Sequence, residues 1–365
     1  MVSPEVRRKF RDRGVQMIRP DAGRRAMILE IERGRKGDVE VILGEGPWAR
    51  VEAALPRADV LSLPLLRNLT PTTNSGGVEI IRVLDTDHDL YLRDHKLDGL
   101  PVLPAAIAME LMAEAALYGW PEFEVIGVEA LRVFNGIIIE NGSKTVRVFA
   151  RPETQPDPER LELSVDVSIS DASDQRNYYR ATVLLGRRLP LPPETTQPQS
   201  EGLRPFSMSV ADVYKRWLFH GPLFQRIVSI DSISEEGMTA TLVPSVPAEC
   251  VSAVNAGEWV IDPMIIDSAF QLAIIWSRTY RDMTPLPARF ERYRRFAPLR
   301  GSSIRCHFRA HANSGGHNLE TQIALFDPEG RLLGLLEGME FSCSKALNRL
   351  AARESTGNAH YGFNY

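Results

Sequence analysis

Cysteine is scarce in this sequence, and long hydrophobic runs are absent. The 365 residues include only Cys250, Cys306 and Cys343, which are widely spaced and form no CxxC pair. An odd, scattered set does not build a disulfide framework and is typical of a reducing compartment. No apolar run approaches the roughly 20 residues that cross a bilayer, and the charged start MVSPEVRRKFRDRG differs from a secretory signal. We therefore expect a cytoplasmic protein that does not contact membranes.

Charge of one sign is not in excess either. Lys and Arg number 43 and Asp and Glu number 47, so the net charge of −4 gives no general reason to bind nucleic acid. The run RFERYRRF places Arg292, Arg294 and Arg295 among aromatic residues, but in an acidic protein one such run is more typical of a solvated strand face. Cys306 and His307 lack a second ligand pair, so we expect no metal site there.

Two long segments share one organisation, with many short strand-like runs around a single apolar helix. The first spans 57–189, with a helix predicted at 104–118, and the second spans 206–346, with a helix predicted at 263–277. Pro104 and Asp262 are suitable starts for these helices. Because both helices are apolar nearly all round, they should be buried. The pattern predicts an α+β fold in which each half is a sheet wrapped around one helix, with GIIIE at 136–140 among the strands.

The remaining segments are shorter. Residues 190–205 are rich in proline and predict an exposed linker, and residues 347–365 form a C-terminal tail. Residues 1–56 read as two helices and two strands, with Asp21 capping the second helix, but they are too few to enclose a good core. We expect this segment to be part of a neighbouring domain.

The first chemical motif is HxxxGxxxxP, formed by His95, Gly99 and Pro104. His95 lies on an extended segment just before a buried helix, and Gly99 lets the backbone approach a ligand closely. A base beside backbone N–H groups suits removal of a proton next to a carbonyl, because the donors hold the developing oxyanion. Val102 and Leu103, within the motif, should line the substrate site. A lone histidine would more often be structural, but the full spacing favours catalysis.

The second motif is DPMIIDSAFQ, in which Asp267 and Gln271 lie four residues apart and share one helix face. Burial would raise the pKa of Asp267 and let it act as an acid, whereas the nearby helix N-terminus favours the anion. A purely structural carboxylate is an equally good interpretation of this motif alone.

The third motif is FHGPLFQ. His220, Gly221, Pro222 and Phe224 form a tight turn beside an apolar surface, which suits substrate binding. From spacing alone, a plain loop is at least as good an interpretation.

In this order, HxxxGxxxxP, GPxFQ and DxxxQ resemble the dehydratase domains of type I polyketide synthases over about residues 57–346. The resemblance implies a double hot-dog fold, with His95 as catalytic base, Asp267 as catalytic acid and Gln271 placing the carboxyl. Two residues depart from the family pattern. His220 replaces the usual tyrosine, which puts a role for a phenol hydroxyl in doubt, and Asp262 replaces a histidine.

The resemblance also implies partners. The substrate would be a β-hydroxyacyl thioester on the phosphopantetheine arm of an acyl carrier protein, and the domain would need no cofactor of its own. Residues 1–56 resemble the end of a ketoreductase domain but lack a GxGxxG fingerprint. A ketoreductase-like segment followed directly by a dehydratase-like one resembles the domain order of iterative synthases of polyunsaturated-fatty-acid or enediyne type. This resemblance implies other synthase domains as partners and a homodimer.

Two alternatives to dehydration remain at this stage. One is a double-bond isomerase or hydratase, and the other is a non-catalytic hot-dog module that shapes products. The presence of both His95 and Asp267 favours catalysis. Dehydration would require a neutral His95, a protonated Asp267 with a pKa above the usual value of about 3.9, and N–H donors between Gly99 and Pro104.

Overall fold

The computed structural model of the chain describes residues 20–33, 63–67, 69, 71–74, 77–153, 161–174, 176–193, 202–254, 257–311 and 316–351. The chain divides into two units, Met1–Val60 and Leu61–Tyr365. The three chemical motifs all lie in the second unit.

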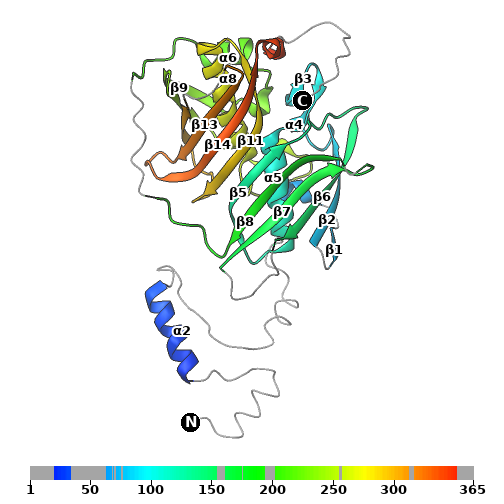
Figure 1. The fold of residues 1–365 in the computed structure, drawn as a ribbon, viewed down its shortest axis with the longest axis vertical. Helices are drawn as coiled ribbons and strands as arrows, with labels where there is room; N and C mark the ends of the chain where they lie inside the picture. Colours follow the sequence, from blue (N-terminus) through cyan, green and yellow to red (C-terminus); the bar gives the residue numbers. More distant parts are fainter. Residues whose placement is uncertain are drawn as a thin grey trace. The chain divides into compact units, whose positions relative to one another are not determined.

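The described residues of the second unit form one large antiparallel sheet, with the spatial order β1-β2-β6-β7-β8-β5-β11-β14-β13-β12-β10-β9 (Figure 1). The strands of its first half are β1 (Thr72–Asn74), β2 (Gly77–Asp85), β5 (Glu124–Val133), β6 (Ser143–Pro152), β7 (Glu162–Asp171) and β8 (Asn177–Gly186). The strands of its second half are β9 (Ile227–Ser234), β10 (Gly237–Leu242), β11 (Thr284–Arg295), β12 (Ile304–Ala310), β13 (Asn318–Phe326) and β14 (Leu332–Ser344).

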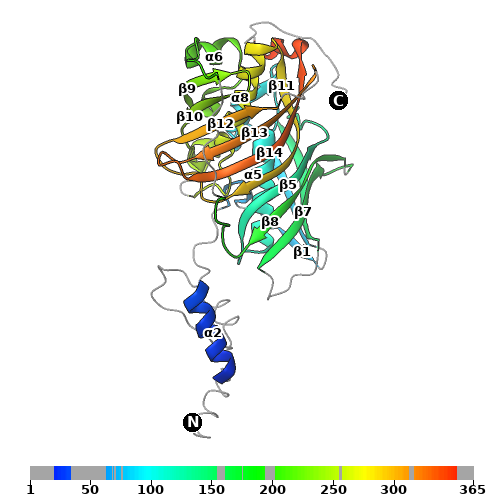
Figure 2. The same ribbon diagram turned by 60° about the vertical axis from the view of Figure 1, so that its left-hand side comes forward.

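The two halves repeat one topology. Counted outward from the junction, the first half reads β5, β8, β7, β6, β2, β1 and the second reads β11, β14, β13, β12, β10, β9. Corresponding positions are therefore filled by corresponding strands. At the junction β5 pairs with β11, so the two predicted sheets are joined edge to edge (Figure 2). This arrangement confirms the double hot-dog fold.

One long helix lies inside each half. They are α5 (Ala105–Gly119) and α8 (Pro263–Tyr280), close to the predicted ranges. Most of their residues are buried, because the strands of each half curve around an apolar cylinder. The Asp262 carboxylate caps α8 by accepting hydrogen bonds from Met264 N at 2.9 Å and Ile265 N at 3.3 Å. Pro104 is the residue before the first turn of α5 and gives no side-chain cap.

The predicted strand at 136–140 is wrong. This segment makes only an isolated bridge between Ile138 and Val102. Its backbone pairs instead with the segment after His95, because Leu103 N donates to Ile137 O and Ile139 N donates to Pro101 O. Of the apolar side chains that suggested a strand, Ile137 and Ile139 are buried and Ile138 is partly buried.

Strand β11 contains the run RFERYRRF, and only part of it faces solvent. Phe290, Tyr293 and Arg295 are buried. Arg294 pairs with Glu337 at 3.1 Å, at the junction of the two halves. Arg294 and Arg295 therefore make contacts within the sheet. The prediction of a solvated face holds for only some positions of this run.

The shorter elements connect these parts. They are the 3-10 turns η1 (Pro64–Leu66), η2 (Pro222–Phe224) and η3 (Lys345–Ala351), the helices α4 (Tyr91–Asp94), α6 (Val210–Arg216) and α7 (Pro247–Cys250), and the hairpin of β3 (Lys96–Leu97) and β4 (Leu100–Pro101). Among the described residues, no helix has the length and apolar character needed to span a membrane.

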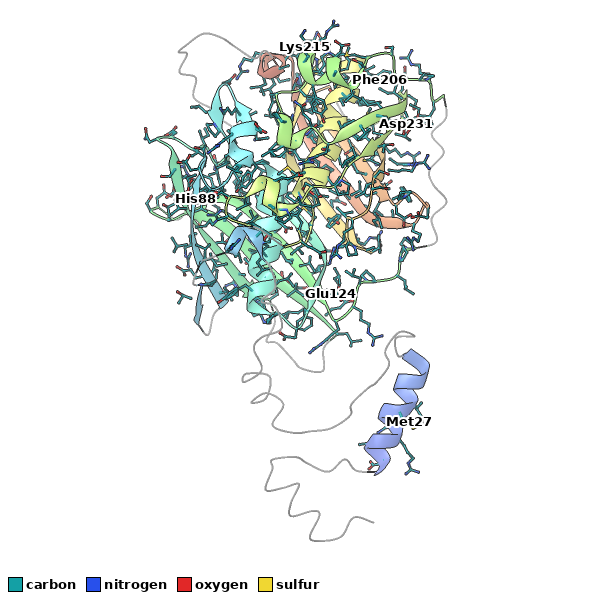
Figure 3. All side chains as sticks on the ribbon, turned by 180° about the vertical axis from the view of Figure 1, so that it is seen from behind. Met27, His88, Glu124, Phe206, Lys215 and Asp231 are labelled. Carbon is teal, nitrogen blue, oxygen red and sulfur yellow. The ribbon has the colours of Figure 1, made fainter. Side chains whose placement is uncertain are left out.

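In the first unit, the described residues form the single helix α2 (Pro20–Arg33), with Asp21 in its first turn. This agrees with the helix predicted there. Met27, labelled in Figure 3, and Ile28 are exposed on α2. The rest of the predicted ketoreductase-like segment lies outside the described residues, so that assignment stays a prediction.

Candidate active site

His95 is held as a neutral base. It follows α4 in an extended conformation, with φ of −126°, and its side chain is buried. Its Nδ1 lies 2.8 Å from Val102 O, so Nδ1 carries the proton that it donates to this carbonyl. This tautomer leaves the lone pair on Nε2. Burial lowers the pKa of His95 to about 4, against the opposing effect of the Asp267 charge, so the ring is neutral at pH 7.

The hairpin after His95 explains the spacing of the first motif. Gly99 lies in its turn with φ of +82°, a conformation that side chains other than glycine rarely adopt. Val102 N donates to His95 O and Leu103 N donates to Ile137 O. These two N–H groups are therefore unavailable to a substrate, which corrects the expectation of oxyanion donors throughout the stretch from Gly99 to Pro104.

Asp267 comes from the second turn of α8, in the other half of the fold. Gln271, one turn further on, donates from Nε2 to Asp267 Oδ2 at 2.8 Å and to Phe224 O at 3.0 Å. The hydroxyl of Tyr214, on α6, donates to Gln271 Oε1 at 3.0 Å. The amide is thus fixed on both sides and donates to the carboxylate, while the placing role that the resemblance gives to Gln271 stays a prediction.

His220 lies beside this carboxylate. Its Nε2 is 3.3 Å from Asp267 Oδ2, and both side chains are almost fully buried. The ring of Phe219 stacks on the His220 ring, with centroids 4.1 Å apart and an angle of 23° between the planes. The ring of Phe224 lies 5.5 Å from that of His95. Aromatic residues of the third motif therefore enclose both histidines.

A backbone contact brings the third motif to the first. Gly221 N donates to Asp94 O at 2.7 Å, and Leu223 N donates to Asp94 Oδ2 at 2.8 Å. A Cβ atom at Gly221 would lie only 2.5 Å from Asp94 Oδ1, so glycine is required for this approach. Asp94 immediately precedes His95, and the contact therefore sets the distance between the two histidines.

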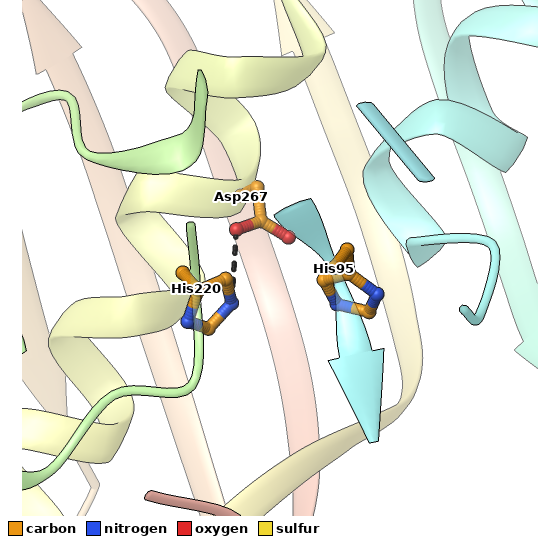
Figure 4. Close-up of side chains that lie close together, drawn as sticks. All are labelled: His95, His220 and Asp267. Atoms are coloured by element: carbon orange, nitrogen blue, oxygen red, sulfur yellow. Dashed lines mark ion pairs between the residues drawn. The ribbon is translucent and has the colours of Figure 1, made fainter. Parts of the chain in front are cut away.

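Three reactive groups meet as a result (Figure 4). One ring nitrogen of His95, one of His220 and one oxygen of Asp267 lie within 4.8 Å of one another. In Figure 4 one Asp267 oxygen faces His220 and the other lies toward His95. Two histidines and a carboxylate could bind a metal ion, but Asp267 Oδ2 already accepts from Gln271 and pairs with His220. We therefore interpret this cluster as a set of proton-transfer groups.

The charge of Asp267 differs from the sequence expectation. Burial raises the pKa of Asp267, but the charge of His220 and its hydrogen bond, together with His95 and Gln271, bring the pKa below its ordinary value. Without a bound substrate, Asp267 is therefore a carboxylate at neutral pH. The expectation of a raised pKa is wrong because it did not include His220 as a partner.

A pocket opens onto these groups from both halves. It is lined by His95, Val102, Leu103, His220, Asp267 and Gln271 of the predicted site, and otherwise mainly by apolar side chains. Gly99, Pro104, Gly221, Pro222 and Phe224 are not among its lining residues. Gly99 and Gly221 shape the backbone as described above and Phe224 lies near the His95 ring, and the binding roles expected of all five stay predictions. Pro285 and Pro287 of β11 also line the pocket, on the side where β11 pairs with β14 but not with β5.

Sequence reasoning missed several residues of this site, and three of them contact or directly adjoin the predicted groups. Asp94 and Phe219 directly precede two of the predicted histidines, and Tyr214 lies on a short helix. No spacing rule singles them out, because their partners lie far away in the chain. Adjacency to His95 and His220 was the only available signal.

A double hot-dog fold with a histidine from one half and an aspartate from the other defines a dehydratase-like class of protein. Two family models agree with it. The model for the polyketide synthase dehydratase domain matches residues 64–168, and that for the polyketide synthase dehydratase N-terminal domain matches residues 190–351. The chain belongs to the polyketide synthase dehydratase family, which dehydrates β-hydroxyacyl intermediates in polyketide and fatty-acid synthesis.

Individual relatives support the assignment. A polyunsaturated fatty acid synthase polypeptide from Thraustochytrium sp. is 26% identical over 309 residues, which cover 82% of this chain and 10% of that protein. The chain thus spans about a tenth of the length of this curated relative. The dehydratase domain of the CurJ module of curacin polyketide synthase has a TM-score of 0.58 at 18% identity, covering 79% of this chain and 98% of that one. The PpsC dehydratase domain from Mycobacterium tuberculosis has a TM-score of 0.58 at 22% identity, covering 77% and 99%.

Proposed function

We propose that this chain removes water from a β-hydroxyacyl thioester carried by an acyl carrier protein, with His95 as base and Asp267 as acid. The observation that carries the proposal is the meeting of these two side chains, one from each half, in a single buried pocket. Neither half holds both groups. The pairing of β5 with β11 therefore keeps the reaction centre together.

The chemistry requires three groups, because the α-hydrogen is weakly acidic and hydroxide leaves poorly. Neutral His95 takes the α-proton on Nε2, which its lowered pKa of about 4 permits at pH 7. Asp267 faces the β-hydroxyl and directs a proton to it. Ala105, in the first turn of α5, lines the pocket. The N–H groups of such a turn lack intrahelical acceptors, so we assign the thioester oxygen to it.

The form of the substrate follows from the pocket. Its lining is mainly apolar apart from the reacting groups, which suits an acyl chain. The PpsC domain was solved in complex with C12:1-CoA, a thioester, which supports a thioester substrate here. We propose phosphopantetheine on an acyl carrier protein as the carrier, other synthase domains as partners, and a homodimer as the assembly. A monomer in sedimentation would exclude only the dimer.

The direct test is mass spectrometry of a β-hydroxyacyl carrier protein after incubation with the enzyme. We expect loss of one water from the acyl group, and a loss of rate of about a hundredfold or more in His95→Ala. An isomerase would leave the mass unchanged, and a non-catalytic module would leave the substrate intact. Equal turnover of the free acid would exclude the carrier but not the dehydration.

A further inference from the structure

The proposed reaction needs a source for the proton that the β-hydroxyl takes when it leaves as water. The β-hydroxyl must receive a proton to leave as water, yet the contacts of Asp267 favour its carboxylate form. His95 cannot supply that proton, because it must be neutral to act as the base. The remaining group in contact with Asp267 that can carry a transferable proton is His220.

We propose that the acid of this site is the His220–Asp267 pair, in which His220 stores the proton as an imidazolium and passes it to Asp267 as the hydroxyl leaves. This inference rests on the proposed dehydratase function. His220 is a positioning residue in this scheme, because it acts on the substrate through Asp267. The pair also explains how histidine can stand where the family usually has tyrosine.

The geometry supports a stored proton. His220 Nε2 lies 3.3 Å from Asp267 Oδ2, in a buried environment where an ion pair is little screened by solvent. In the described part of the chain, His220 Nδ1 is buried and has no hydrogen-bond partner. Among the described residues an imidazolium would leave its Nδ1–H without an acceptor, a cost that the contact of Nε2 with the Asp267 carboxylate must offset. The stacked Phe219 ring keeps the imidazole plane in place.

Other charged or titratable groups surround the pair from every side. His95 faces it across the pocket, with its ring centroid 5.5 Å from that of His220. Asp94 contacts the turn after His220 through Gly221 and Leu223. Tyr214 reaches Asp267 through Gln271. The pair therefore belongs to a connected network of polar groups around the pocket.

The proton balance closes without any further reagent. The Cα–H bond breaks and its proton goes to His95, while the Cα–Cβ double bond forms and the Cβ–O bond breaks. The departing oxygen takes the proton of Asp267, which has received it from His220, and leaves as water. The site begins with a His220–Asp267 ion pair and ends with a His95–Asp267 ion pair. Return of the proton from His95 to His220 resets it.

The first test compares the pH dependence of kcat for the wild type and His220→Gln, with loss of water as the readout. In His220→Gln the only remaining acid is the Asp267 carboxyl, and a carboxyl loses its proton at lower pH than an imidazolium does in reference compounds. We expect the alkaline limb of this variant to move down by about one unit or more. Rate losses should therefore be at least about tenfold greater above pH 8 than below pH 6. A uniform loss at every pH would assign His220 a merely structural role and overturn the inference.

The matched control is His88→Gln. His88 is an exposed histidine whose Nδ1 lies 3.0 Å from Asp85 Oδ1, so it forms a similar pair outside the pocket (Figure 3). Its loss should leave the pH profile unchanged. A shift as large as that of His220→Gln would also overturn the inference, because a distant histidine would then have the same effect.

The second test does not depend on turnover. In protein labelled with ¹⁵N-histidine, the His220 ring nitrogens should report an imidazolium at pH 7 in the wild type and a neutral ring in Asp267→Asn. A neutral His220 in the wild type would overturn the inference even if dehydration is observed. If the wild type dehydrates nothing but His220 is an imidazolium paired with Asp267, the proposed function fails and the pairing stands.

Discussion

The two halves of this protein have the same strand order but use the carboxylates of their central helices in opposite ways. On α8, Asp267 lines the pocket and pairs with a histidine. On α5, Glu110 and Glu114 are fully buried, and in the described part of the chain their hydrogen bonds come from backbone amides. Glu110 accepts from Val260 N and Ile261 N, and Glu114 accepts from the backbone of η1. Helix α8 thus carries a reactive carboxylate into the pocket, whereas the carboxylates of α5 hydrogen-bond to backbone segments that are distant in the sequence.

The difference shows that burial alone does not decide the charge of a carboxyl group. Burial raises the pKa of Glu110 to about 8, although two backbone N–H groups oppose it. Burial acts on Asp267 in the same direction, but His220, His95 and Gln271 together outweigh it and lower the pKa. The side-chain contacts of Asp267 therefore lower its pKa, whereas two backbone N–H groups and the charge of Arg295 do not offset burial at Glu110.

Removal of the reactive carboxylate should have the largest effect. We expect Asp267→Asn to slow dehydration by about a hundredfold or more, because the amide can neither carry the proton nor hold His220 in its charged form. The measurement is single-turnover loss of water from the carrier-bound substrate. Glu235→Gln, an exposed carboxylate on the turn after β9, is the control and should react at the wild-type rate. A folded Asp267→Asn protein with near wild-type turnover would remove Asp267 from the mechanism.

A smaller effect should follow from separating the two halves of the site without changing a reactive group. In Gly221→Ala the new Cβ would lie 2.5 Å from Asp94 Oδ1 and 2.8 Å from its Cβ, so Asp94 and the adjacent His95 must shift. Misplacement of a base costs about tenfold or more in kcat. Gly316→Ala, where no atom lies within 4 Å of the added Cβ, is the matched control. Equal activity of the two variants would show that this contact does not position His95.

The sequence was sufficient for the parts of the fold and site that depend on local spacing. It placed both central helices to within a few residues, since their apolar pattern and start signals are local. It also placed Asp267 and Gln271 on one helix face, because residues four apart on a helix are neighbours. The order of the motifs and the family resemblance together indicated that His95 and Asp267 meet.

The sequence was insufficient where a residue depends on a distant partner. Asp94 meets Leu223 across 129 positions, and no local pattern records such a contact. The effect of His220 on Asp267 was missed for the same reason. Pro285 and Pro287 obscured the start of β11, because proline usually argues against a strand. It is tolerated here where β11 pairs with β14 but not with β5.

Removal of the hydrogen bond that holds Asp267 should reduce kcat less than the displacement of His95 in Gly221→Ala. Gln271→Ala removes the hydrogen bond from Nε2 to Asp267 Oδ2 but leaves His220 in place. A hydrogen bond to a charged group contributes about 1.5 kcal/mol or more, which is equivalent to about tenfold or more. Because His220 still contacts the carboxylate, we expect only part of this contribution to be lost, a decrease of severalfold that appears mainly in kcat. Tyr214→Phe, which removes only the hydroxyl that orients Gln271, should cost less. A larger loss in Tyr214→Phe than in Gln271→Ala would contradict this hierarchy.

The smallest effect on catalysis should come from the carboxylates of α5, and it should appear in stability instead. With a folded pKa of about 8 and an ordinary value of 4.5, Glu110 retains its proton in the folded state over a range where the unfolded state has lost it. The stability that this provides is present at low pH and is lost as the pH rises from 4.5 through 8. Between pH 6.5 and 8, the free energy of unfolding of the wild type should therefore fall, by about 1 kcal/mol or more from this group.

Glu110→Gln should reduce that fall, because the amide does not titrate and still offers one acceptor to Val260 N or Ile261 N. Urea unfolding at pH 6.5, 7.25 and 8 measures the difference, and kcat at pH 7 should stay within a few-fold of the wild type. Glu235→Gln serves again as the exposed control, whose unfolding should follow the wild type across the series. If Glu110→Gln follows the wild type as well, Glu110 is ionised throughout this range, and its contacts compensate burial as fully as those of Asp267 do.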